Sequence, residues 1–212
     1  MGTRNTLVAL LLALSAVGAT ASDAFVGTIA VGLGPMNEVG EVKTSFSADA
    51  RAKTEEGTIN SRLHYRPGMV RDEMEMGGQK VVTIRRMDLK KVWMIMVGQG
   101  MYMESVPGQP SEQAPEYRLV SREVIGPETV KGMATTKYKS VYESDEGRFT
   151  GFTWYTEDHI AVKAVLMSEN RGEKQRLEYE LSNLKRDTQA PSLFEVPAGY
   201  RKLDMGGIPR MR

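Results

Sequence analysis

Apolar and polar residues alternate over short segments of this chain, and turns that contain glycine or proline recur about every ten residues. No window of a dozen residues repeats with the period of a helix. A period of two is typical of strands that bury one face, and frequent turns favour antiparallel neighbours. The pattern therefore predicts a mainly β protein with few or no helices, built on one large curved antiparallel sheet. An open barrel, a half-barrel and a sandwich all fit this pattern.

The predicted strands form two series on either side of a proline-rich loop, Val106–Glu116. This loop contains three prolines and a glycine, which disfavour both a helix and the regular backbone hydrogen bonds of a β-sheet. Before the loop, the pattern over residues 58–104 predicts a meander of five antiparallel strands. A second meander follows it, with a turn at 126–132 after its first strand, and its strands are predicted at Tyr117–Ile125, Met133–Tyr142, Arg148–Thr156, Ile160–Ser168 and Lys174–Leu184.

The segments that flank the two meanders are less regular. Glu41–Lys53 reads as a long strand, in which weak apolar character after Phe46 leaves a short helical turn open as an alternative. Phe25–Leu33 reads as an edge strand or a loose arm. Near the end of the chain, the rigid apolar segment 190–200 is predicted to close one end of the sheet, and residues 205–212 are expected to be frayed.

The segment Lys91–Ser105 is apolar on both faces, which predicts that it is covered on both sides. One face carries Trp93, Ile95 and Val97, and we expect it to lie against a loop or the tail. The sequence leaves open which of the two faces looks into the concavity of the sheet, and we favour the other one. It carries Val92, Met94 and Met96, and after a turn at Gly98-Gln99-Gly100 the next strand places Met101 and Met103 together on one face.

Methionine is concentrated in this part of the chain, where eight of the fourteen methionines lie between Met69 and Met103. Flexible thioether side chains suit either an irregular core or an adaptable apolar surface. Packing in a core is the simpler interpretation, and the alternative is a lining that holds an apolar ligand. The residues predicted for such a lining are Met74, Met76, Val92, Met94, Met96, Met101, Met103, Phe152 and Trp154.

Residues 1–21 have the three parts of a secretory signal peptide. Arg4 provides a positive charge, Leu7–Val17 is apolar, and Ala19-Thr20-Ala21 is a small-residue cleavage site. Cleavage near Ala21 would leave residues 22–212 as a single domain in the periplasm, and retention of the segment as a membrane anchor is the alternative. After cleavage we expect no integral membrane segment.

Composition narrows the function further. The formal net charge is +1, from 28 basic and 27 acidic residues. The protein therefore has no strong electrostatic field that would favour binding to nucleic acid or to an anionic membrane. The chain has no cysteine, which excludes disulfides, thiolate metal ligands and a lipid-modified cysteine. A secreted protein of this size without cysteine is more typical of the bacterial envelope than of the proteins that animal cells secrete.

Candidate chemistry is sparse. His64 lies in a polar strand, and His159 ends the turn Glu157-Asp158-His159, whose adjacent side chains cannot all aim at one metal ion. No motif of a nucleophile elbow, a zinc protease or a phosphate-binding loop is present. The sequence therefore predicts no catalytic residue, no metal site and no cofactor. A hydrolase or metal enzyme without a recognisable motif is the least supported alternative.

Several runs of residues resemble a family of secreted bacterial proteins of unknown function, grouped with the LolA/LolB-like outer-membrane lipoprotein carriers. The resemblance extends over most of the chain after the signal peptide, and five runs carry it. They are R-P-G-M-V-R-D-E-M-E-M-G-G-Q-K (66–80), I-R-R-M-D-L-K-K-V-W-M-I-M (84–96), M-Y-M-E (101–104), G-P-E-T-V-K-G-M-A-T-T-K-Y (126–138) and P-S-L-F-E-V-P-A-G-Y (191–200).

The resemblance implies an unclosed antiparallel β-barrel whose concave apolar interior holds acyl chains. In the carriers, helices form a lid over this interior. Here neither 106–116 nor the arm before Glu41 has an amphipathic helical pattern. The leading hypothesis is a non-enzymatic periplasmic protein that binds a lipid, an acyl chain or a lipoprotein in a half-barrel. The second is an envelope module with a filled core and no ligand, which docks a protein partner.

Overall fold

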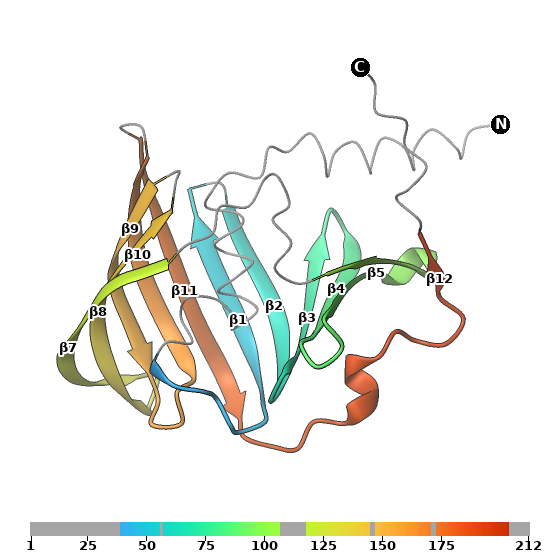
Figure 1. Ribbon diagram of the computed structural model, residues 1–212, viewed down its shortest axis with the longest axis horizontal. Coiled ribbons are helices and arrows are strands. Elements are labelled where there is room, and N and C mark those ends of the chain that lie inside the picture. The colour runs from blue at the N-terminus through green and yellow to red at the C-terminus, as the bar shows by residue number, and fades with distance from the viewer. Residues whose placement is uncertain (1–38, 56, 107–117, 145–146, 171–172, 204–212) are drawn as a thin grey trace.

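A computed structural model describes residues 39–55, 57–106, 118–144, 147–170 and 173–203 of this protein. Twelve strands in these ranges form one sheet, in the order β12-β6-β5-β4-β3-β2-β1-β11-β10-β9-β8-β7. All neighbours pair antiparallel except β12 and β6, which are parallel. Figure 1 shows the sheet curving from β7 at one edge to β12 at the other without closing.

Strand β1 joins two meanders, because it pairs with β2 on one side and with β11 on the other. The strands are β1 (Phe46–Thr54), β2 (Gly57–Arg66), β3 (Met69–Met76), β4 (Gln79–Arg86), β5 (Lys91–Met96), β6 (Met101–Ser105), β7 (Arg118–Val130), β8 (Met133–Ser144), β9 (Gly147–Tyr155), β10 (Ala161–Asn170), β11 (Glu173–Lys185) and β12 (Arg201–Lys202). Two short 3₁₀ helices interrupt them, η2 (Val97–Gln99) and η3 (Pro191–Phe194).

The predicted architecture is confirmed: the fold is mainly β, with a single curved, unclosed sheet. The five-stranded meander predicted over 58–104 corresponds to β2–β6, and the turn after β5 ends at Gly100, which adopts the left-handed conformation that glycine tolerates. The strand predicted at Glu41–Lys53 begins later, at Phe46, and stays extended through the alanines where a helical turn had been an alternative.

Strand β7 runs further than the sequence predicted. The turn expected at 126–132 shrinks to Lys131-Gly132, and β7 continues through Gly126 and Pro127 to Val130. A shift of register between Val124 and Gly126 accommodates the glycine. Proline lacks a backbone N–H, but β7 is the last strand in the sheet order and needs to donate hydrogen bonds on one side only.

Some predicted segments lie outside the described residues. These are the signal peptide, the expected strand Phe25–Leu33, the proline-rich loop apart from Val106, and the tail 205–212.

The two sides of the sheet are named here by the residues of β1. The inner face is the one that carries Phe46, Ala48, Ala50 and Ala52, and the outer face is the opposite one. The main hydrophobic cluster lies mostly on the inner face, inside the curve of the sheet. Its members there that are most completely buried include Tyr142, Phe149, Tyr155, Leu166, Leu177 and Tyr179. On β11 the buried residues Leu177, Tyr179 and Leu181 alternate with more exposed neighbours and face inward.

A second, smaller hydrophobic cluster lies on the outer face of β4 and β5. It consists of Val82, Ile84, Trp93 and Ile95 together with Phe194 from η3. The Phe194 side chain is 0 % exposed. The tail that was predicted to close one end of the sheet instead passes beneath these strands, as Figure 1 shows, and then adds β12 along the free edge of β6.

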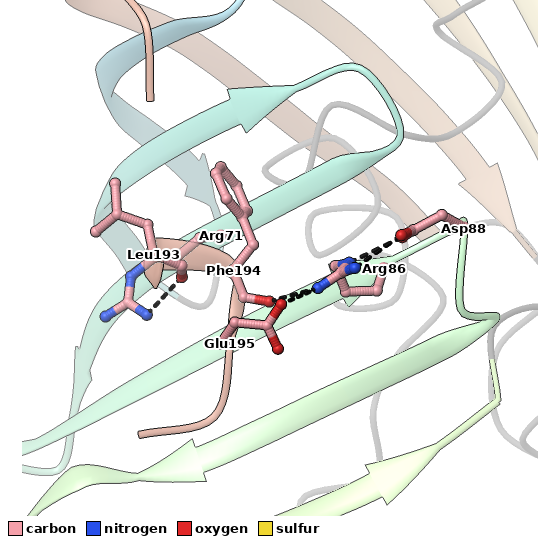
Figure 2. Close-up of polar contacts among 6 residues, drawn as sticks. All are labelled: Arg71, Arg86, Asp88, Leu193, Phe194 and Glu195. Carbon is pink, nitrogen blue, oxygen red and sulfur yellow. Dashed lines mark hydrogen bonds and ion pairs between the residues drawn. The ribbon is translucent and has the colours of Figure 1, made fainter. Parts of the chain in front are cut away.

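Two arginines fasten the tail to the sheet, as Figure 2 shows. The Arg71 guanidinium donates a 3.0 Å hydrogen bond to the carbonyl of Leu193, and that of Arg86 donates to the carbonyl of Phe194 at 3.2 Å. Arg86 also forms an ion pair with Glu195 and a two-pronged pair with Asp88, at 2.8 and 2.7 Å. Packing the tail against the sheet would leave these two backbone carbonyls without hydrogen-bond donors. Because the arginines donate to them, the contacts hold η3 against the outer face.

Candidate functional site

The registers of β3–β6 bring the predicted methionines onto one surface. One cross-strand row runs Met74, Val81, Met96, Met101, and the next contains Met94 and Met103 side by side. Since Ser61 pairs with both Ala50 and Met74, this surface lies on the inner face. We call it the methionine face and define it as Met74, Val81, Val92, Met94, Met96, Met101 and Met103.

The side chains of the methionine face are packed less completely than those of the core. Met101 is 8 % exposed, and the other six are only partly buried. In the part of the chain that the structure describes, none of the seven belongs to either hydrophobic cluster. The outer face of the same strands carries Trp93 and Ile95 under the tail, as the sequence predicted for this pair of faces. The methionine face is therefore a continuous apolar surface whose side chains can still pack against a further partner.

A buried acid borders the methionine face. Asp72 lies on the inner face of β3, two residues before Met74, in a row with Thr83 and Met94. Its side chain is 0 % exposed, and neither carboxylate oxygen has a hydrogen-bond partner of normal geometry. Burial raises the pKa of the Asp72 carboxyl to about 6, against the opposing effect of the nearby Ser61 hydroxyl.

Sequence reasoning missed Asp72, although a signal for it was present. The alternation of β3 that turns Met74 inward also turns Val70 and Asp72 inward, so an acid stands at a position with apolar phase. Arg85 follows the same phase on β4, between Val70 and Val92, and burial lowers the pKa of its guanidinium. The inner face of these strands therefore combines an apolar area with a few buried polar groups at its border.

The structure does not bring Phe152 and Trp154 to the methionine face. Thr153, which separates them on β9, faces inward with its hydroxyl 3.2 Å from that of Ser140, so its two neighbours face outward. There the Lys137 ammonium lies 4.9 Å from the Trp154 ring centroid, and that of Lys163 lies 4.8 Å from it. The two aromatic residues thus form an outer cation–π cluster in the other half of the sheet.

Met76 is the remaining residue of the predicted lining. Its backbone pairs with Gln79 in the β3–β4 ladder, and its side chain lies outside the described part of the structure.

The histidines and the acidic turn have local structural partners. The His64 Nδ1 lies 2.8 Å from the Gln189 amide oxygen, and the His159 Nδ1 lies 3.3 Å from the carbonyl of Glu41. Asp158 accepts two hydrogen bonds from Arg186, at 2.8 and 2.9 Å, which hold the pKa of the Asp158 carboxyl at about 2. Within the described ranges, no group of three or more histidine, cysteine or acidic side chains is placed to hold a metal ion.

The described ranges also contain no helix with the length and apolar character needed to cross a membrane.

Solved structures of other proteins have a similar fold. An uncharacterized conserved protein from Thermus thermophilus is similar to this chain with a TM-score of 0.55 and 12 % sequence identity, over 80 % of this chain and 94 % of that one. At this identity the likeness concerns the fold alone. No protein-family profile and no curated protein matches the sequence.

Two further structures are similar at lower scores. The MucA/MucB complex of Pseudomonas aeruginosa aligns with a TM-score of 0.46 and 16 % identity, over 74 % of this chain and 57 % of that one. The lipoprotein LppX of Mycobacterium tuberculosis aligns with a TM-score of 0.39 and 10 % identity, over 72 % and 91 %. The architecture that the resemblance to LolA/LolB-like carriers implied, one unclosed curved antiparallel sheet, is confirmed at the level of the fold.

Proposed function

We propose that this protein is a non-enzymatic protein of the bacterial envelope that binds an acyl chain on the methionine face. The observation that carries the proposal is that seven neighbouring apolar side chains on four strands lie outside both hydrophobic clusters of the described chain. Such a surface gains free energy when an apolar partner covers it, at about 25 cal/mol for each Å² removed from water.

An acyl chain suits this surface better than a rigid ligand. Five of the seven side chains are methionines, whose thioethers adjust to a flexible chain with little strain. The surface lies inside a curved sheet, so a bound chain can be contacted from more than one side. The predicted signal peptide would deliver the protein to a compartment that is bounded by lipid on both sides.

A second function, as an envelope module with a filled core, is favoured by the other half of the sheet. There Tyr142, Phe149 and Tyr179 are almost completely buried on the inner face and leave no room for a ligand among themselves. This function predicts that the methionine face is only an irregular extension of the core.

Uptake of a fluorescent dodecanoic acid distinguishes the two functions. We expect the wild-type protein to bind it, and Met94→Glu to weaken binding at least ~10-fold, because a carboxylate would lose water against the chain. Met167→Glu is the matched control, since Met167 is exposed on the outer face of β10. It is expected to bind like the wild type. Circular dichroism and the urea midpoint verify that both variants fold.

Native mass spectrometry of protein purified from its own envelope tests the proposal without any variant. We expect a co-purified species that organic solvent extracts and that contains an acyl chain. Protein that is consistently ligand-free and does not take up the fluorescent acid would contradict the proposal and favour the filled module.

A further inference from the structure

We propose that Asp72 binds the polar end of this ligand, and that this end is a primary ammonium group. The inference rests on the proposed function, because it adds a head-group site to the surface that would hold the chain. It predicts that the preferred ligand is a single-chain amphiphile with an amine at its head.

Asp72 lies where the methionine face meets the filled core: Leu63 is opposite it on β2, and Thr83 is opposite it on β4. Beyond Thr83 the same row continues with Met94 and Met103. A ligand whose chain lies along this row would therefore bring its head to the Thr83 hydroxyl and the Asp72 carboxylate.

Both oxygens of Asp72 are buried without a hydrogen bond of normal geometry, and among the described residues no arginine or lysine forms an ion pair with it. Arg71, the neighbouring cation on β3, faces outward and is held by Glu73 at 2.6 Å and by the carbonyl of Leu193. A buried carboxylate without donors costs several kcal/mol. Burial is the main cause of the raised pKa of Asp72, and the nearby Ser61 hydroxyl opposes it only in part.

A primary ammonium offers three donors and one positive charge, so it can satisfy both carboxylate oxygens and use its third hydrogen on the hydroxyl of Thr83 or Ser61. An anionic head would be repelled by Asp72, so a fatty acid is expected to bind more weakly, through its chain alone, and a hydroxyl offers a single donor. Met74, two residues along β3, and Met94, in the same row as Thr83, have flexible side chains that can adjust to a bound head.

Three probes with the same chain length test the inference: dodecylamine, dodecanol and dodecanoic acid, each competing with the fluorescent acid at pH 7.5. We expect the wild-type protein to bind dodecylamine at least ~10-fold tighter than dodecanol, the ratio typical of one hydrogen bond to a charged group. Asp72→Asn, which keeps the shape of the side chain, is expected to abolish this preference and to leave dodecanol binding within about 2-fold. Asp49→Asn, an acid on the outer face of β1, is the matched control.

The outcomes separate the inference from the proposed function. If the wild type binds all three probes equally, the inference is overturned and the acyl-chain site stands. If Asp72→Asn weakens all three probes equally, Asp72 only supports the structure and the inference is overturned as well. If none of the probes binds, the proposed function itself fails. The preference of the wild type is measured without any variant, so it decides the matter even if Asp72→Asn does not fold.

Discussion

The two halves of this sheet bury opposite faces. In β8–β11 and β1 the inner face carries the core, with Phe149, Leu177 and Tyr179 packed inside the curve. In β4 and β5 the described core lies on the outer face instead, beneath Phe194 of the tail. A sheet needs an apolar cover on one face for stability, and the tail provides that cover from outside. The inner face of β4–β6 is therefore not needed to hold the fold together, whereas Val70 on the inner face of β3 still belongs to the main cluster.

The two inner surfaces also differ in the kind of side chain. The filled half uses aromatic and branched residues, whose shapes are fixed and which interdigitate to a dense core. The methionine face uses unbranched thioethers, which fill space adaptably and specify it poorly. The difference indicates that one half maintains the fold while the other is adapted to contact something that is not part of it.

The sharpest test compares adjacent residues of β5. Ile95 is 1 % exposed in the tail-covered cluster, whereas its neighbour Met96 lies on the methionine face. We expect Ile95→Glu to lose more than about 4 kcal/mol of unfolding free energy, because it buries an unpaired charge. Met96→Glu is expected to lose about 1 kcal/mol or less, since the new carboxylate remains hydrated. Urea unfolding followed by tryptophan fluorescence measures both.

Equal loss in the two variants would mean that both faces of β5 are core, and the distinction between the halves would fail. Met96→Asn controls for the loss of the thioether without adding a charge, and it should resemble Met96→Glu if the methionine face is wet.

The second test removes the cover. Phe194→Ala is expected to lose about 3–5 kcal/mol, the usual cost of emptying a fully buried phenylalanine site. Leu193→Ala, at a partly buried neighbour in η3, is the control and should cost about 1–2 kcal/mol. If Phe194→Ala left the urea midpoint unchanged, the tail would be an accessory and the outer cluster would not hold the second half of the sheet.

Much of this arrangement could be predicted from local alternation alone. The two apolar faces of β5, the inward phase of Met74 and the meander β2–β6 all depend on residues that are close in sequence. The alternation along β9 also places Phe152 and Trp154 together on one face. Their side relative to the methionines was predicted wrongly, because it depends on every register between β3 and β9, and one bulge or turn reverses the phase.

The path of the tail and the isolation of Asp72 could not be predicted for a different reason. Segment 190–200 is apolar enough to cover several surfaces, and its position is decided by Arg71 and Arg86, which are more than a hundred residues away. That Asp72 lacks a partner is a property of its surroundings in space. The sequence places it in the apolar phase of β3 and cannot say whether a cation lies opposite.

The third test concerns Asp72 and pH. Its pKa is about 6 in the folded protein and near 3.8 in the unfolded chain, so the folded state holds the proton more firmly between these values. Stability should therefore fall as pH rises from about 4 to about 6, by up to about 3 kcal/mol. Asp72→Asn lacks this titration and should be more stable than the wild type above pH 6, with a difference that shrinks below pH 4. Urea unfolding at pH 4, 5, 6 and 7 measures it.

The opposite result would be a free energy of unfolding that rises with pH in the wild type and is not increased by Asp72→Asn. It would mean that the Asp72 carboxylate has hydrogen-bond partners in the folded protein. The methionine face would then have no unsatisfied head-group site at its border.

The smallest expected effect concerns the end of the tail, where Glu104 of β6 links three elements on the outer face. Its carboxylate accepts hydrogen bonds from Lys202 at 2.9 Å, from the Trp93 indole at 2.9 Å and from Lys91 at 3.2 Å, which together lower the pKa of the Glu104 carboxyl to about 2. This contribution is complete above pH 4.5 and is lost as pH falls toward 2, the opposite sign to Asp72. Because the side chain is 23 % exposed, Glu104→Gln should cost only about 0.5–1 kcal/mol at pH 7. A loss that survives at pH 2 would place the role of Glu104 in shape, leaving Phe194 and the arginines as the contacts that fasten the tail to the outer face.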